Sequence, residues 1–229
     1  MAKHIGIIGV TPEGAALCYK AICSEASKIL DAYKYPEITL HQQSFDSILA
    51  AQNKRDWPKV ASLLLESINK VASSGAEFAV IPANSVHYAF KEVQAKSPIP
   101  LISIVDVTVE ECKLRGYDKI AVIGTGLTMS NGLYEAPLKE KGIETIIPEK
   151  ADQEKLNEVI FNELVHGKWS TKSVDEVVQI IGKLKIKGCK AVVLACTEIP
   201  LIINEGNSPL PCIDTIELLA KKAVELALK

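Results

Sequence analysis

The chain has 229 residues, of which 48% are hydrophobic, so it is long enough to bury one large core or two smaller ones. Its formal net charge of -2 leaves no basic field that would attract nucleic acid or an anionic membrane surface. No apolar run approaches the roughly 20 residues of a membrane span, and the first apolar stretch is too short for a signal peptide. We therefore expect a cytoplasmic protein that acts on a small molecule, with no nucleic-acid or membrane partner.

Short runs rich in Val and Ile alternate along the chain with longer segments of helical periodicity. This pattern is typical of parallel strands that are buried on both faces and covered by helices. The predicted strands are residues 4–9, 38–42, 78–82, 101–104, 119–124, 145–147, 191–195 and a short one near 211–213. The predicted helices are residues 13–30, 56–74, 86–96, 106–115, 130–141, 153–166, 174–187 and 215–228. The sequence thus predicts the α/β class.

Prolines and glycines punctuate these helices. Pro58 suits the first turn of the second helix, where a missing backbone N–H costs nothing. Gly75, Gly116, Gly142 and Gly188 each follow a predicted helix, where a left-handed residue can end it.

An internal similarity divides the chain into two halves. GAEFAVIPANS (75–85) aligns without a gap with GCKAVVLACTE (188–198) at an offset of 113, and HIGIIGV (4–10) resembles KIAVIGT (119–125) at an offset of 115. Any two buried strands resemble each other, but here polar residues also follow both. The pattern predicts two similar Rossmann-like α/β lobes, one of residues 1–100 with about 211–229 and one of residues 101–210.

Polar tripeptides follow the matching strands of the two halves: Ala83-Asn84-Ser85 and Cys196-Thr197-Glu198. The carboxyl ends of parallel strands are where open α/β sheets bind ligands. Hydroxyls there, and N–H groups at the starts of the following helices, suit a substrate carboxylate. Thr11 and Thr125 follow two equivalent strands and offer further hydroxyl donors.

Cys196 is the residue that its chemistry singles out. At a strand–helix junction, a helix dipole and nearby donors are expected to lower the pKa of its thiol, so that it acts as a base or a nucleophile. The other cysteines sit in apolar surroundings and are expected to be small core residues: Cys18, Cys23, Cys112, Cys189 and Cys212. No CxxC pair or Cys/His cluster has zinc-ligand spacing, which predicts that there is no metal site.

The glycine-containing turn GVTPEG (9–14) is a weak candidate for a phosphate loop. It lacks the Gly-Lys-Ser/Thr ending that cradles phosphates, and it does not match the glycine fingerprint of dinucleotide-binding folds. A nucleotide site is therefore not expected.

Three segments together, IGIIGVTPEG (5–14), IPANSVHYAF (81–90) and VLACTEIPLII (193–203), resemble the aspartate/glutamate racemase superfamily over nearly the whole chain. The resemblance implies two similar lobes related by a pseudo-twofold axis, with the active site between them. It also implies a homodimer that acts on an amino acid or dicarboxylate with no pyridoxal phosphate, metal or other cofactor. In this family one cysteine removes the α-proton and a second returns a proton to the opposite face.

The resemblance also assigns site residues. Cys196 matches the family's second cysteine, and Gln52 falls near a position that helps to bind the distal carboxylate. His87 follows the first motif and either tunes it or has a helix-surface or packing role. The remaining matches are to substrate-holding or thiol-orienting positions: Asn84, Ser85, Thr197, Glu198 and, as weaker matches, Thr11, Thr125 and Thr128.

Ala83 departs from the family pattern because it stands where the first cysteine is expected, and a methyl group cannot carry a proton. Three explanations stay open: an inactivated variant, a natural one-sided enzyme, or a second proton supplied by Ser85, His87 or water. Two other functions also stay open. One is a single-cysteine lyase or isomerase, of the arylmalonate decarboxylase or maleate isomerase type, and the other is a non-catalytic dicarboxylate-binding protein.

Overall fold

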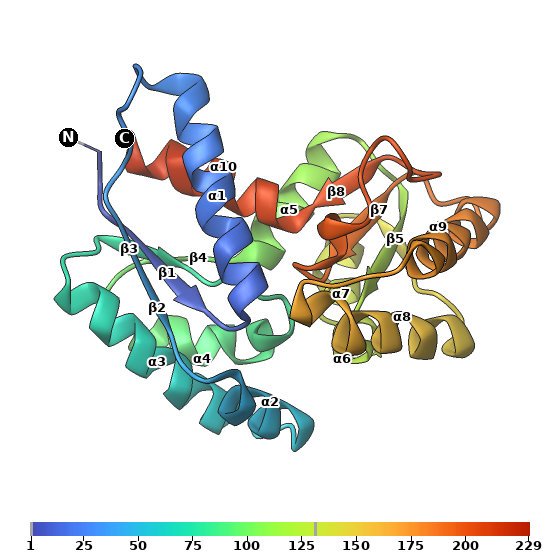
Figure 1. Ribbon diagram of the computed structural model, residues 1–229, viewed down its shortest axis with the longest axis horizontal. Helices are drawn as coiled ribbons and strands as arrows, with labels where there is room; N and C mark the ends of the chain where they lie inside the picture. The colour runs from blue at the N-terminus through green and yellow to red at the C-terminus, as the bar shows by residue number, and fades with distance from the viewer. Residues whose placement is uncertain (1, 131) are drawn as a thin grey trace. The chain divides into compact units, whose positions relative to one another are not determined.

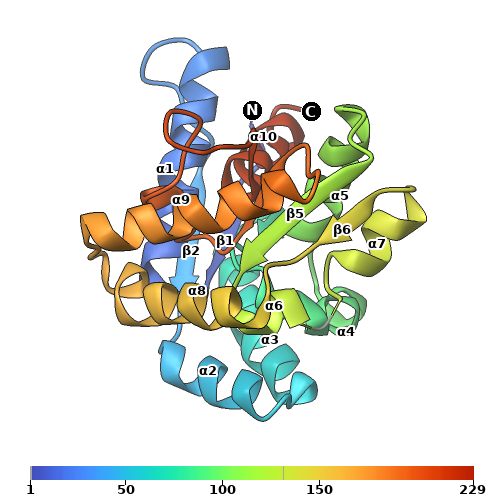
Figure 2. The same cartoon turned by 90° about the vertical axis from the view of Figure 1, so that its right-hand side faces the viewer.

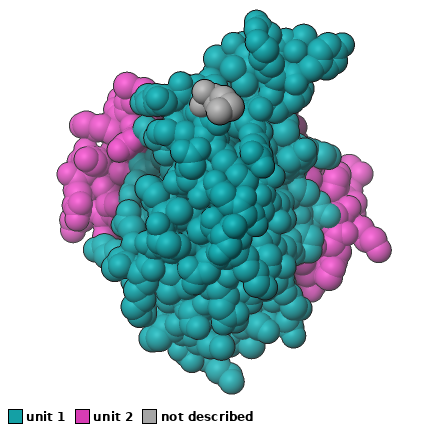
Figure 3. Space-filling model, turned by 90° about the vertical axis from the view of Figure 1, so that its left-hand side faces the viewer, with its two compact units in different colours: residues 1–107, 216–229 teal, residues 108–215 magenta. Residues whose placement is uncertain are grey.

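The computed structural model describes residues 2–130 and 132–229, which form two compact α/β units (Figure 1). The first unit comprises Met1–Val107 and Ile216–Lys229, and the second comprises Thr108–Thr215; Figure 3 distinguishes them by colour. Each unit contains one four-stranded parallel sheet, so the predicted fold class is confirmed. Within the described ranges, no helix is both long enough and apolar enough to span a membrane.

The sheet of the first unit has the strand order β2-β1-β3-β4. Its strands are β1 (Ile5–Gly9), β2 (Ile38–Gln42), β3 (Phe78–Val80) and β4 (Leu101–Ile102). The helices that begin within this part of the chain are α1 (Pro12–Ile29), α2 (Phe45–Asn53), α3 (Trp57–Ser73), η1 (Ser85–Ala89), α4 (Phe90–Lys96) and α5 (Ile104–Leu114). The last helix, α10 (Thr215–Ala227), returns to this unit, where the backbone N–H of Lys3 donates to the carbonyl of Ala227 at 2.7 Å.

Helices α1 and α3 cover opposite faces of β1, since side chains alternate along a strand. Ile8 packs in one apolar cluster with residues of α3. At Gly6, on the same face as Ile8, an added Cβ would lie 2.8 Å from Cγ2 of Val71 in α3. At Gly9, on the other face, it would lie 3.2 Å from Cβ of Ala15 in α1. Both glycines therefore allow a helix to approach the sheet closely.

The second unit repeats this strand order, as β6-β5-β7-β8. Its strands are β5 (Lys119–Gly124), β6 (Glu144–Ile146), β7 (Val192–Ala195) and β8 (Cys212–Asp214). Its helices are α6 (Gly126–Ser130), α7 (Glu135–Glu140), α8 (Lys150–Asn162), η2 (Leu164–His166), α9 (Thr171–Ile186) and η3 (Ile199–Leu201). Helices α8 and α9 run side by side (Figure 2), and their apolar side chains form one cluster with β5 and β7.

The internal similarity of the sequence corresponds to the same strand pairing in both units. Gly6 pairs with Ala79 between β1 and β3, and Ala121 pairs with Val192 between β5 and β7. These are counterparts at the offsets of 115 and 113 found in the sequence. Gly75 and Gly188, which are also counterparts, both have positive φ, at 97° and 89°.

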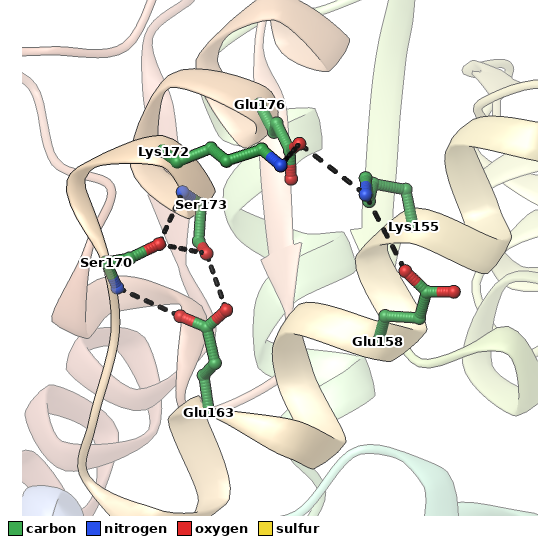
Figure 4. A network of polar contacts seen from close by, with 7 residues as sticks. All are labelled: Lys155, Glu158, Glu163, Ser170, Lys172, Ser173 and Glu176. Carbon is green, nitrogen blue, oxygen red and sulfur yellow. Dashed lines mark hydrogen bonds and ion pairs between the residues drawn. The ribbon is translucent and has the colours of Figure 1, made fainter.

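A polar network fixes the connection between α8 and α9 (Figure 4). One carboxylate oxygen of Glu163 accepts from the hydroxyl of Ser173 at 2.6 Å, and the other accepts from the backbone N–H of Ser170 at 2.9 Å. The Ser170 hydroxyl in turn accepts from the N–H of Ser173 at 3.1 Å and so caps α9. Nearby, Lys155 of α8 forms an ion pair with Glu176 of α9 at 3.5 Å. These contacts hold α8 against α9.

Most predicted elements are confirmed within a few residues, and α3 has a proline in its first turn as expected of Pro58. The main error is α2, which was not predicted. It is short, its N-cap residue Ser44 makes no side-chain capping bond to the described residues, and the residues that it buries are Ile48, Ala51 and Gln52. The sequence therefore offered neither a start signal nor a long periodic stripe.

The bounds of four other predicted elements were also wrong. The strand predicted at 101–104 ends at Ile102, because Ser103 caps α5 by accepting from the N–H of Asp106 at 3.1 Å. The helix predicted at 86–96 is divided into η1 and α4, and the strand predicted at 78–82 ends before Pro82, which has no N–H for a ladder. The helix predicted at 130–141 is instead α6 and α7, and residue 131 lies outside the described residues.

Candidate active site

In the second unit, the motif after β7 forms a buried acid–thiol pair. The thiol of Cys196 donates to Oε2 of Glu198 over 3.1 Å, and the hydroxyl of Thr197 donates to the same oxygen over 3.0 Å. The three residues are 6%, 4% and 3% exposed. The predicted motif is thus a compact cluster in which one carboxylate oxygen receives two hydrogen bonds.

The environment of Cys196 keeps its thiol protonated. Burial, and then the negative charge of Glu198, raise the pKa of the thiol well above its ordinary value, and backbone donors offset only part of this. The expectation of a lowered pKa is therefore wrong. The element that follows is the three-residue turn η3 rather than a long helix, so little dipole field opposes the desolvation.

Threonines at the ends of β1 and β5 have equivalent roles. Oγ1 of Thr11 accepts from the N–H of Gly14 at 3.2 Å, and Oγ1 of Thr125 accepts from the N–H of Thr128 at 3.3 Å. The hydroxyls of Thr125 and Thr128 also lie 3.1 Å apart. The predicted pair Thr125 and Thr128 is therefore brought together, and Thr11 caps α1.

The ends of β5 and β7 are in close contact. A Cβ added to Gly124 would lie 2.6 Å from the carbonyl oxygen of Ala195, the residue before Cys196. Two residues that support these ends were not predicted from the sequence. Asn157 of α8 accepts from the N–H of Gly126 at 2.8 Å, and the fully buried Thr215 donates to the carbonyl of Leu194 at 3.0 Å. Thr215 carried a usable signal, because it follows a predicted strand as Thr11 and Thr125 do, whereas a mid-helix asparagine such as Asn157 carries none.

In the first unit, Ala83 and Asn84 are buried after β3, and the turn is closed by the N–H of Ala83 donating to the carbonyl of Ile81 at 2.8 Å. The amide of Gln52 donates to the hydroxyl of Ser85 at 2.8 Å. Gln52 belongs to α2. A helix that was not predicted therefore positions a site residue that was predicted. The first motif thus combines a buried methyl group with a polar Gln52–Ser85 pair.

His87 contacts the backbone of the first motif. Its Nδ1 lies 2.8 Å from the carbonyl oxygen of Ala83, and its Nε2 accepts from the backbone N–H of Ile104 at 3.3 Å. Because Ile104 can only donate, the proton must sit on Nδ1. Burial lowers the pKa of His87 to about 4, and its ring stacks on Phe90 with centroids 4.8 Å apart. Both ring nitrogens are therefore engaged with backbone, which fits a packing role better than delivery of a proton.

Comparison with known proteins supports the resemblance predicted from the three motifs. The family model for Asp/Glu/Hydantoin racemase matches residues 7–223. The broad specificity amino-acid racemase RacX of Bacillus subtilis (strain 168) is 24% identical over 231 residues, which cover 96% of each chain. The structure of an aspartate racemase homologue from Pyrococcus horikoshii OT3 is 33% identical, with a TM-score of 0.86 and coverage of 100% of both chains. The Picrophilus torridus aspartate racemase shares the fold, with 22% identity and a TM-score of 0.78. That match covers 99% of this chain and 95% of the other. The chain belongs to the Asp/Glu/Hydantoin racemase family.

Proposed function

We propose that this protein catalyses cofactor-independent proton transfer at the α-carbon of an acidic amino acid, with Cys196 as the acid/base. The observation that carries the proposal is the buried hydrogen bond from the Cys196 thiol to the Glu198 carboxylate. Glu198 is an acceptor for the thiol proton, and the thiolate so formed is a stronger base because its pKa is raised. The names of the relatives, an amino-acid racemase and an aspartate racemase homologue, support an amino-acid substrate.

The proposed step moves one proton and one electron pair. The thiolate takes the α-proton, an S–H bond forms, the C–H bond breaks, and its electron pair stays on the α-carbon. The reverse step returns a proton from Cys196 to the same face. A hydroxyl donor such as that of Thr197 is suited to hold a substrate carboxylate and to stabilise the charge that develops.

Inversion requires a second proton carrier on the other face of the planar carbanion, and three groups near the first motif are poor candidates. Ala83 carries only a methyl group. The Ser85 hydroxyl is engaged with Gln52, and both ring nitrogens of His87 are engaged with backbone. We therefore propose a one-sided enzyme, which exchanges the α-proton of one enantiomer much faster than it inverts it.

The test is incubation with each enantiomer of aspartate and glutamate in heavy water, following the α-proton signal by NMR and the product by chiral chromatography. We expect one enantiomer to lose its α-proton signal with retention of configuration. Cys196→Ala abolishes this exchange, whereas Cys189→Ala, a buried cysteine of the same apolar cluster outside the motif, retains it. Exchange that persists in Cys196→Ala would exclude Cys196 as the base, and no exchange with any of the four substrates would contradict the proposal.

A single-cysteine decarboxylase is the second candidate, because a protonated Cys196 without a cysteine at residue 83 also suits delivery of a proton to one face of a carbanion. That reaction breaks a carbon–carbon bond, releases carbon dioxide, and transfers the thiol proton to the carbon that keeps the electron pair. Release of carbon dioxide from a disubstituted malonate, absent in Cys196→Ala, would favour it over amino-acid exchange.

A further inference from the structure

A cavity of about 170 Å³ lies within the second unit, against one face of the β5–β6 pair. Thr145 of β6 is paired with Ile120 of β5, and side chains on a strand return to the same face every two residues. Val122 and Ile147 therefore lie on the face of Thr145, and all three line the cavity. Residues from α6 to α7, among them Thr128 and Glu135, form its other walls. We call it the β6 cavity.

The hydroxyl of Thr145 is the unusual feature of the β6 cavity. Its Oγ1 atom is buried and has no hydrogen-bond partner among the residues that the structure describes. Buried hydroxyls in folded proteins almost always have a hydrogen-bond partner, because a buried hydroxyl without a hydrogen bond destabilises the fold. The volume is large enough for several water molecules or for one small organic molecule. An unpartnered hydroxyl at a cavity of this size indicates a place where a ligand would make a hydrogen bond.

The polar lining favours a cation. Among the described residues that line the β6 cavity, the charged group is the carboxylate of Glu135, and none is basic. Thr128 and Thr145 add hydroxyl oxygens that can accept N–H donors. An anion would meet Glu135 without a compensating positive charge. A group of three or more His, Cys, Asp or Glu side chains able to hold a metal ion does not occur in the described part of the chain, which makes a divalent metal the poorer fit.

We propose that the β6 cavity binds a small primary ammonium compound, with its N–H groups donating to Thr145 and its charge balanced by Glu135. The site is connected to the candidate active site of the same unit, because Thr128 lines the cavity and its hydroxyl lies 3.1 Å from that of Thr125 at the end of β5. The inference does not depend on the proposed function, since binding is measured without turnover.

The first experiment titrates ethylammonium chloride into the protein at constant ionic strength and follows backbone amide signals by NMR. We expect saturable shifts of residues 122–147. Sodium chloride and tetramethylammonium chloride, which has no N–H donor, should give none. Ammonium and potassium chloride separate an organic from an inorganic ligand: saturation by these salts but not by ethylammonium would overturn the proposal. Shifts that never saturate would overturn it as well.

Variants of Thr145 provide the matched test. Thr145→Val keeps the shape of the side chain and removes the hydroxyl, so we expect ethylammonium affinity to fall about tenfold or more. The melting temperature without ligand should rise, because an unpartnered hydroxyl is replaced by a methyl group. Thr145→Ser should keep the binding, and Glu135→Gln should weaken it about threefold or more. Unchanged affinity in Thr145→Val, or a lowered melting temperature without ligand, would contradict the inference.

Discussion

The thiol of Cys196 lies 3.1 Å from the carboxylate of Glu198, inside the second unit and with a single residue between them in the chain. The thiol is the donor, so the proton is on sulfur and the carboxylate is the acceptor. Burial and the charge of Glu198 both favour this protonated form. Under the proposed function, we expect the pair to exchange this proton when a bound substrate changes its surroundings.

Replacing Glu198 by glutamine should lower the pKa of Cys196. The substitution removes the second cause of the raised pKa, the negative charge, and leaves the first, burial, in place. The pKa should thus fall and still remain above that of a free thiol. It is measured from thiolate ultraviolet absorbance against pH, as the difference between Glu198→Gln and the double variant that also carries Cys196→Ser. Glu149→Gln on the exposed start of α8 is the control, and a rise in the pKa would contradict the assignment.

Ala83→Cys should convert one-sided exchange into inversion. The new thiol stands at the position of the motif in the first unit that corresponds to Cys196 in the second. Chiral chromatography should then show both enantiomers interconverting, whereas Ala83→Ser, with a hydroxyl of much higher pKa, should not gain this activity. Inversion by the unmodified protein at the rate of the variant would show that another group already carries the second proton.

Acid should destabilise the protein through His87. Its pKa is about 4 in the folded state against 6.5 in an ordinary environment, so between these values the unfolded chain binds more protons. The free energy of unfolding should therefore decrease as the pH falls through this range, by up to about 3 kcal/mol from this residue. Urea unfolding from pH 7 to pH 4 measures the loss.

His87→Gln tests this assignment, because glutamine can still donate to Ala83 and accept from Ile104 but does not titrate. The variant should show a flatter dependence of stability on pH. His166→Gln, at an exposed position, should behave as the unmodified protein does. An equally steep dependence in His87→Gln would assign the acid sensitivity to other groups.

Two glycine substitutions should have opposite effects on stability. Gly124→Ala places a methyl carbon 2.6 Å from a backbone oxygen of Ala195, so the ends of β5 and β7 must separate, and we expect a loss of about 1–3 kcal/mol. Gly182 lies inside α9, where an added Cβ meets no atom within 4 Å. Gly182→Ala should therefore stabilise the protein by about 0.5–1 kcal/mol. Thermal unfolding distinguishes the two, and a stable Gly124→Ala would mean that the strand ends can move apart freely.

The sequence was most informative where local chemistry and position agree. The strands β2 and β5 have the predicted bounds. The pairing of Gly6 with Ala79 in the first unit is repeated by that of Ala121 with Val192 in the second, as the internal similarity predicts. Cys196, Thr197 and Glu198 are consecutive residues at the end of a strand, so their grouping could be predicted from the sequence.

Features that depend on distant contacts were not readable. The pKa of Cys196 is raised mainly by desolvation in a core built from α8, α9 and β7, and no local sequence pattern indicates this. The tautomer of His87 depends on Ile104, which lies 17 residues away. Helix α2 was missed because its stability comes from packing on α3 rather than from caps or a long apolar stripe.

The return of α10 to the first unit has a consequence for biosynthesis. Residues 216–229 leave the ribosome after the whole of the second unit, and they include Ala227, the acceptor of the bond from Lys3. The second unit is continuous in the chain and can fold while it is still attached to the ribosome. The first unit, although its strands are made first, can close its final contacts only after residues 216–229 have emerged, and these follow the second unit in the chain.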